Sequence, residues 1–402
     1  MAIKYVAYSW QGQKLEGVLQ VDREEDASQE LEREELIPYR LAVVRRRRSI
    51  VALLPFLFRP TPKDLIEFTR STAALLSAGI PLRDTLRSFQ RQTSSLGLKE
   101  VLGKVIEDIE DGRPFSEACA RHPAVFPDFY LGLLRVTEAT GALVPVLERI
   151  LDTLERRKAV KDKVKAALVY PAISLGVAVV AGFVLVTYSL PRLIGLLTEF
   201  GGKLPLTTQL LIHITDFLES YQRLISLSVV GAAALVTTYV RTRHGARVRD
   251  RVLLRLPLVG RVILYSNLFN LTSTLTTVLE AGIAPLEALQ LSREALSNVV
   301  LQERLDKVIA EASAGTSLGQ AFQQHWPSPP LLSQGIQTGE VSGNLPEALR
   351  ALASYYEQET TRSVSGVTEM IQPTVILAVG GMVGFVAVAV ISGIYSTIGS
   401  IK

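Results

Sequence analysis

The sequence predicts an all-α polytopic membrane protein with two repeated cytosolic helical bundles, three transmembrane helices and a small N-terminal β-hairpin and helix. Three observations predict this fold class. Long uncharged stretches occur three times, a pattern of residues recurs 203 positions later, and the mean hydropathy is +0.26 despite 43 basic and 39 acidic residues. A chain of 402 residues also has room for several domains.

The composition excludes several classes of protein. One cysteine, Cys119, rules out an internal disulfide, and the four histidines are too scattered for a zinc-ligand spacing. The phosphate-binding pattern GxxxxGK[ST] is absent, so we expect no ATP hydrolysis by this chain. The uncharged stretches offer no carboxylate for an intramembrane protease. We therefore predict no catalytic residue and no cofactor, and a protein that is not an enzyme.

The N-terminal segment 1–44 begins with two strand-like runs. Lys4–Tyr8 and Gly17–Val21 flank a turn-prone Gln-Gly-Gln sequence, which predicts a β-hairpin, and a helix is expected near Glu24–Glu35. Residues 45–60 then form a basic and apolar linker, whose apolar part is too short to span a membrane.

A pattern of residues from the first half of the chain recurs in the second half. LLSAGIPLRDTL at 75–86 matches VLEAGIAPLEAL at 278–289 at an offset of 203, which falls to 202 after a one-residue deletion. Such self-similarity indicates a duplicated structural unit. The two predicted copies occupy residues 61–168 and 242–370.

Each copy has the periodicity of short helices. Apolar residues recur every three or four positions, as from Leu65 to Gly79. Thr61 precedes a proline and an acidic residue in an N-cap pattern, and glycine and proline breakers divide the copy into about five or six helices. We expect each copy to be a compact helical bundle in the cytosol.

The three uncharged stretches predict transmembrane helices. A bilayer core about 30 Å thick needs roughly 20 helical residues, and the first and third stretches exceed that length. The middle stretch is the weakest, because it is close to the minimum and relies on flanking arginines. The predicted spans are residues 169–191, 223–241 and 371–396.

Basic residues set the expected direction of these spans. Lys and Arg cluster before the first span and after the second, and such clusters are typical of cytoplasmic flanks. The cluster before the first span consists of Arg156, Arg157, Lys158, Lys161, Lys163 and Lys165. The N-terminus is therefore predicted to be cytoplasmic and the C-terminus periplasmic, with the connection 192–222 and the tail 397–402 outside. The net charge of +4 then needs no nucleic-acid partner.

Several motifs occur together along the whole chain. They are Tyr5-x-x-Tyr8 with Gly12 and Gly17, AGIPL-like sequences containing Gly79 and Gly282, LPLVGR at 256–261, and GExSG with Gly339, Glu340 and Gly343. With these motifs the chain resembles the inner-membrane platform family shared by type II secretion systems (general secretion pathway protein F) and type IV pili (pilus assembly protein C). It departs from the family pattern at Thr137, at Gln372 and at Ser392–Tyr395.

The resemblance implies a location and a set of partners. It implies a multi-pass protein of the bacterial cytoplasmic (inner) membrane that acts as the platform from which pilins or pseudopilins are assembled. It also implies a hexameric assembly ATPase docked on the cytosolic face, together with other inner-membrane assembly proteins.

Glu138 and Glu340 are the most informative polar pair. Each is expected near the end of one helix and just before the next, where the helix dipole disfavours a carboxylate, so a compensating partner is expected. A hydrogen bond to backbone N–H groups that open the following helix is the favoured hypothesis. Contact with another subunit, or with a calcium ion as the one candidate metal, is the alternative.

Structural roles are expected for the other repeated residues. Gly141 and Gly343 should allow a positive φ at a turn, and Pro171 and Pro373 should start or kink their spans. Small residues in the spans should allow close helix packing, within the chain or at a seam of a homo-oligomer. These small residues are Ala178, Gly182, Gly380 and Gly384.

The sequence therefore favours a non-enzymatic scaffold that receives mechanical or conformational input from an ATPase. Segments 143–170 and 345–372 run without strong breakers from each bundle to its membrane proline, as rigid levers would. A small membrane transporter or receptor component is the alternative, and a transporter should show polar or charged groups at mid-membrane.

Overall fold

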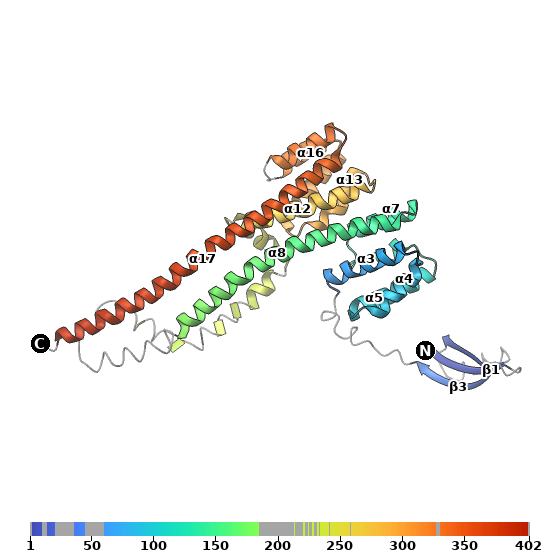
Figure 1. The fold of residues 1–402 in the computed structure, drawn as a ribbon, viewed down its shortest axis with the longest axis horizontal. Helices are drawn as coiled ribbons and strands as arrows, with labels where there is room; N and C mark the ends of the chain where they lie inside the picture. Colours follow the sequence, from blue (N-terminus) through green and yellow to red (C-terminus); the bar gives the residue numbers. More distant parts are fainter. Residues whose placement is uncertain are drawn as a thin grey trace. The chain divides into compact units, whose positions relative to one another are not determined.

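The computed structural model describes most of the chain (Figure 1). The described residues are 2–9, 14–20, 36–44, 60–184, 234–240, 242–257, 259–326 and 330–400, with isolated positions between 213 and 232. They fall into two compact units. One contains residues 1–61 and 90–103, and the other contains residues 62–89 and 104–402.

The first unit contains a three-stranded antiparallel sheet in the order β2-β1-β3. The strands are β1 Ala2–Ser9, β2 Lys14–Gln20 and β3 Leu36–Val44. β3 is a strand that the sequence pattern did not predict, because Pro38 interrupts its alternation. The β1–β3 register shifts at this proline, where a bulge tolerates a residue without an N–H. The predicted helix near Glu24–Glu35 and the linker up to residue 59 lie outside the described residues.

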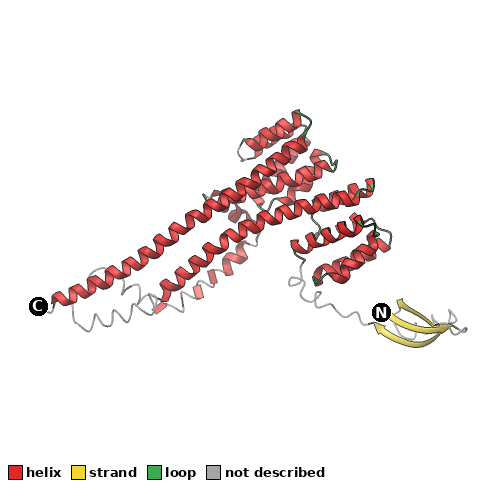
Figure 2. Ribbon diagram, in the orientation of Figure 1, coloured by secondary structure: helices red, strands yellow, loops and turns green. Residues whose placement is uncertain are grey.

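Two series of helices follow (Figure 2), and the second repeats the order of the first after one additional helix at its start. The first series is α3 Pro62–Ser77, α4 Leu82–Gln92, α5 Leu96–Glu110, α6 Phe115–Ala120, α7 Asp128–Thr140 and α8 Leu143–Val184. The second is α11 Arg243–Arg255, α12 Val259–Glu280, α13 Pro285–Ser292, the 3-10 turn η2 Arg293–Ala295, α14 Val299–Ser313, α15 Leu318–His325, α16 Leu331–Val341 and α17 Leu345–Ser400.

The helix bounds reproduce the sequence repeat. α5 and α14 both have 15 residues and start 203 positions apart, and α8 and α17 start 202 positions apart. All six described glycines with positive φ also fall into repeat pairs: Gly79 with Gly282, Gly112 with Gly315, and Gly141 with Gly343. The duplicated helical organisation is therefore confirmed.

An aromatic cluster fills the first bundle. The Phe68 ring meets the rings of Phe89 and Phe126 edge to face, at centroid distances of 5.6 and 5.9 Å. Tyr130 packs on Phe126, and its buried hydroxyl lies 3.2 Å from the Thr69 hydroxyl. The second bundle buries Phe269 and Phe322, with Trp326 packed on Phe322, and Tyr356 of α17 stacks on Tyr265 of α12.

Three described helices are long and apolar enough to cross a membrane: α8, α12 and α17. Burial separates them, because 61% of the most apolar stretch of α12 is buried inside the protein, against 0% for α8 and 6% for α17. Length and hydropathy alone would therefore assign α12 as a membrane span, whereas its packing makes it a core helix of the second bundle. Of the predicted span 223–241, residues 234–240 are helical, with side chains that are largely exposed, and much of the rest lies outside the described residues.

Candidate functional site: paired helices leading from the bundles

α8 and α17 each continue without a break from a bundle into an apolar stretch. α8 has 42 residues and α17 has 56, so they extend about 63 and 84 Å at 1.5 Å per residue. Neither helix begins at its proline. Pro171 and Pro373 occupy the same position, 28 residues after the first residue of their helices. The uninterrupted segments expected before these prolines are therefore present as helix.

The two long helices meet near the start of their apolar stretches. The Thr368 hydroxyl of α17 lies 3.4 Å from the carbonyl oxygen of Ala167 in α8. Beside this contact, α12 contributes to a small apolar cluster that both long helices share. The cluster consists of Val262, Val364 and Val367, with Val164, Ala167 and Ile371 packed against it.

Farther from the apolar stretches of the long helices, α12 also contacts α8 through polar groups. The hydroxyls of Thr153 and Thr277 lie 2.6 Å apart in a buried position. The Arg149 guanidinium donates a hydrogen bond of 2.8 Å to the carbonyl of Glu280, near the C-terminus of α12, where the helix dipole favours a cation. These contacts join the first copy to the second.

Arg157 of α8 is the most heavily buried cation at this junction. Its guanidinium donates to the carbonyl of Asn270 at 2.9 Å and lies 4.9 Å from the centroid of the Phe129 ring. Burial lowers the pKa of Arg157 to about 10. The contact with α12 and the cation–π contact with α7 partly offset the cost of removing this charge from water.

By sequence Arg157 belongs to the basic cluster that precedes the first span, but the structure buries it against α12 and α7. The sequence itself carries a signal for this burial. Arg157 lies on the apolar stripe of α8, in the series of three- and four-residue steps that runs through Ile150, Thr153, Val160 and Val164. An arginine on such a stripe faces the core.

A groove of about 600 Å3 opens between α8, α12 and α17. Charged groups of both signs line it. Arg350 pairs with Glu280 and with Glu347, the latter at 3.0 Å, and Arg156 pairs with Asp152 at 2.9 Å. The groove is a polar surface to which both copies contribute.

Glu138 and Glu340 cap short helices from outside. In the first copy, Glu138 Oε1 accepts the N–H of Ser116 at 2.8 Å and Oε2 accepts its hydroxyl. In the second copy, Glu340 accepts the N–H groups of Leu318 at 3.0 Å and Gly319 at 3.1 Å. The carboxylates therefore occupy the N-termini of α6 and α15, where a helix favours negative charge.

The predicted kind of hydrogen bond is present, but the expected partner was wrong. The capped helix precedes the glutamate by 22 positions instead of following it, because α7 and α16 fold back on α6 and α15. α6 gains most, since its N-cap residue Pro114 makes no side-chain cap. Both oxygens of each carboxylate already have protein donors, and the described residues contain no cluster of three potential metal ligands.

The other motif residues lie where the chain turns or packs closely. Gly141 has φ 74° and Gly343 has φ 71°, so the expected left-handed turns are present. A Cβ on Gly339 would lie 2.8 Å from that of Ala348, so this glycine lets α16 approach α17. In the spans, Gly182 is buried, whereas a Cβ on Gly380 or Gly384 would meet open space. Ala178 is half-buried.

Comparisons with known proteins identify the family. The model of the family described as type II secretion system (T2SS), protein F matches residues 68–191 and 271–393. The type IV pilus assembly protein PilC of Thermus thermophilus is 31% identical over 344 residues, covering 85% of this chain and 84% of that protein. TapC of Aeromonas hydrophila is 29% identical and covers 96% and 94%, and the type II secretion system protein F of Pseudomonas aeruginosa is 27% identical and covers 98% of both.

The fold and the site define a polytopic membrane scaffold built from a duplicated helical unit. The chain belongs to the type II secretion system protein F family, which includes the type IV pilus assembly protein PilC. This is a family of non-enzymatic platform proteins, in agreement with the function predicted from the sequence motifs.

Replacing Glu340 with glutamine tests the capping role. An amide offers one acceptor oxygen in place of two and carries no charge, so the N-terminus of α15 should open more readily by about 1 kcal/mol, or roughly fivefold. Hydrogen exchange measured by mass spectrometry on the full chain in detergent should show faster exchange in a peptide covering α15. Exchange in α14 should not change, and Glu67→Gln, at an exposed site on α3, should leave α15 as in the wild type. Equal exchange in wild type and Glu340→Gln would show that the carboxylate does not hold this helix.

Proposed function

We propose that this platform protein couples a cytosolic hexameric assembly ATPase to the insertion of pilin or pseudopilin subunits into a growing filament at the bacterial inner membrane. The observation that carries the proposal is the continuity of α8 and α17, each of which starts inside a helical bundle and runs into an apolar stretch. A displacement of a bundle is then delivered along the helix axis without passing through a flexible loop.

The junction at α12 makes the two levers act together. α12 packs on both α8 and α17, and the Thr153–Thr277 contact and the Arg157 contacts join the copies. The groove between these helices presents charged groups of both signs to a cytosolic partner, which would bear on both levers at once. Relatives named for pilus assembly and for type II secretion support both forms of the machine.

The proposed organisation keeps the boundaries that the sequence suggests. The cytosolic parts are the segment 1–44, the linker 45–60 and the bundles 61–168 and 242–370. The spans are 169–191, 223–241 and 371–396. The described parts of the first and third spans, residues 169–184 and 371–396, carry no charged side chain, so they offer none of the mid-membrane charge that a transporter would use.

We expect the helix between the second bundle and its span to be required for assembly. Ser365→Pro removes a backbone hydrogen bond and places a ring against the preceding turn, at a cost of about 3 kcal/mol in a helix interior. Ser365 is exposed in α17, so the bundle itself should fold. In the native host, the variant should insert into the membrane and retain its partners, while surface filaments or secreted substrate should fall by at least tenfold. Ser365→Ala is the control. Normal filament output from Ser365→Pro would contradict the lever mechanism.

The partners can be identified by crosslinking in cells. A photoreactive residue at the exposed Ser354, on the rim of the groove, should capture a hexameric assembly ATPase, which mass spectrometry would identify. Recovery of major pilins with it would indicate a pilus, and minor pseudopilins would indicate secretion. Recovery of transporter or receptor subunits alone would contradict the proposed function.

The direction of the chain is also testable. With basic flanks in the cytosol, three spans place the C-terminus in the periplasm and the N-terminus in the cytoplasm. Alkaline phosphatase fused after the last residue should therefore be active, and the same enzyme fused ahead of the first residue should be inactive. The opposite pattern would reverse the proposed topology.

A further inference from the structure

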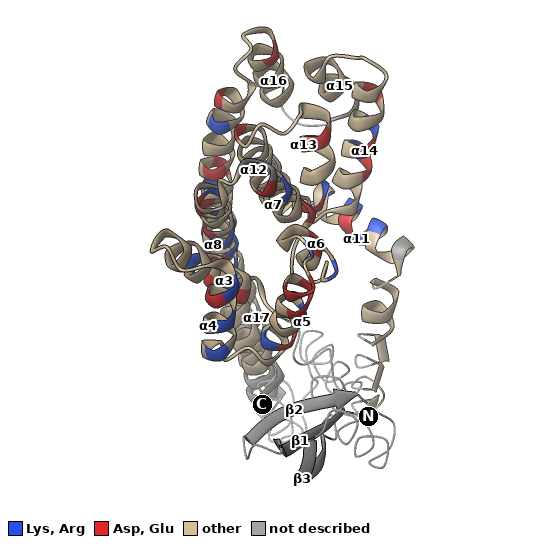
Figure 3. Cartoon of the chain, turned by 90° about the vertical axis from the view of Figure 1, so that its right-hand side faces the viewer, with Lys and Arg blue, Asp and Glu red and all other residues tan. Residues whose placement is uncertain are grey.

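A second cavity, of about 470 Å3, lies where α11 turns into α12. Four arginines line it, and the remaining lining side chains are apolar. The arginines are Arg251, Arg255, Arg261 and Arg304. Among the described residues that line it, the cavity therefore has four positive charges and no carboxylate. Two of these arginines, Arg251 and Arg255, belong to α11, and Lys and Arg are drawn in blue in Figure 3.

Three carboxylates of α11 and α14, those of Asp250, Glu303 and Asp306, already pair with other arginines. Arg247 bonds to Glu303 through Nε at 2.7 Å, Arg249 pairs with Asp250 at 2.7 Å, and Asp306 pairs with Arg293 at 2.6 Å. Within the described part of the chain, none of the four cavity arginines forms an ion pair. Their charge is available to an anion from outside.

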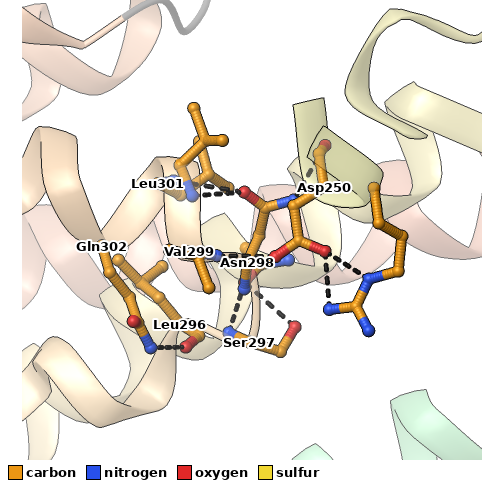
Figure 4. A network of polar contacts seen from close by, with 10 residues as sticks. Asp250, Leu296, Ser297, Asn298, Val299, Leu301 and Gln302 are labelled. Carbon is orange, nitrogen blue, oxygen red and sulfur yellow. Dashed lines mark hydrogen bonds and ion pairs between the residues drawn. The ribbon is translucent and has the colours of Figure 1, made fainter. Parts of the chain in front are cut away.

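The cavity is rigidly built. Asn298 caps α14 by accepting the N–H groups of Val300 and Leu301, and Asp250 of α11 accepts the N–H of Val299 at 2.8 Å (Figure 4). The Asn267 side chain of α12 accepts the N–H of Ser297 at 2.7 Å. This network ties together the three helices that form the cavity wall, so the arginines extend from a fixed frame.

The LPLVGR motif at 256–261 forms the corner between α11 and α12. A Cβ on Gly260 would lie 2.3 Å from the carbonyl oxygen of Leu254, so only glycine lets α12 start this close to α11. Arg261, the last residue of the motif, then enters the cavity. The proposed lever mechanism leaves this motif without a role.

Position and polarity together point to a lipid. Val262, next to Arg261, packs on Ala167 and Val367, which lie within about 6 Å along their helices of the proposed starts of the spans at 169 and 371. Beside the arginines, Val248, Val252 and Leu256 form an exposed stripe at four-residue steps, 44 to 52% exposed. An apolar stripe next to cations is typical of a helix lying at a membrane surface.

We propose that this cavity binds the headgroup of an anionic phospholipid from the cytoplasmic leaflet, with the apolar stripe of α11 resting against the acyl boundary. The four guanidinium groups match phosphate oxygens, which arginine binds in a bidentate way. A soluble phosphate would satisfy the arginines but would leave the stripe exposed. The site rests on the proposed membrane boundary of the function given above.

Native mass spectrometry of the full chain, extracted from vesicles of phosphatidylcholine with phosphatidylglycerol, tests the proposal. The wild type should retain phosphatidylglycerol, and Arg255→Gln with Arg261→Gln should retain at least tenfold less. Lys161→Gln with Lys165→Gln removes the same charge from exposed membrane-flank sites of α8 and should retain as much as the wild type. Arg255→Lys with Arg261→Lys keeps the charge and should retain an intermediate amount.

Three results would overturn the lipid site. One is that Arg255→Gln with Arg261→Gln retains as much phosphatidylglycerol as Lys161→Gln with Lys165→Gln. Another is displacement of the lipid by millimolar inorganic phosphate, which would indicate a soluble anion site. The third is exclusive crosslinking of a photoreactive residue at Val252 to a protein. Insertion into the vesicles is scored separately by resistance to carbonate extraction. A chain that fails to insert contradicts the proposed membrane function, whereas one that inserts without lipid preference contradicts only the lipid site.

Discussion

The packing of α12 between α8 and α17 is the constraint on which the rest of the structure depends. α12 is buried around much of its circumference, and each large apolar side chain that it buries contributes about 1.5–3 kcal/mol relative to exposure. No single neighbour can cover such a helix, so both long helices must lie against it. This requirement joins the first copy to the second, determines where Arg157 is buried, and brings α8 and α17 together close to their apolar stretches.

Much of the fold could be predicted from the sequence because the helix ends are set by local signals. Glycines such as Gly141 and Gly343 end helices by adopting positive φ, and the recurrence of such glycines at offsets of 203 and 202 residues indicates the duplication from the sequence alone. The role of Glu340 was only half predictable. Its place near a helix C-terminus shows that it needs a donor, whereas the identity of that donor depends on how α16 folds back on α15, which is a tertiary property.

Hydropathy fails where burial in protein and burial in lipid have the same composition. α12 passes a test for membrane spans by length and apolar content, and only its neighbours show that it is a core helix. Arg157 is the opposite case, a charged residue that is buried inside the protein. Its charge suggested a membrane flank, although its position on the apolar stripe of α8 places it inside. The periodicity of a charged residue relative to its apolar neighbours therefore carries information that a count of cations discards.

The equal spacing of Pro171 and Pro373 from the starts of their helices has a consequence for how motion is delivered. At about 100° per residue, 28 residues correspond to nearly eight full turns of helix. Because the spacing is the same in both copies, each proline lies at the same rotation about the helix axis relative to the first residue of its own helix. A twist applied to either bundle arrives at its proline with the same phase, about 42 Å away along the axis. The two copies therefore present helices of the same length and the same rotation between bundle and proline.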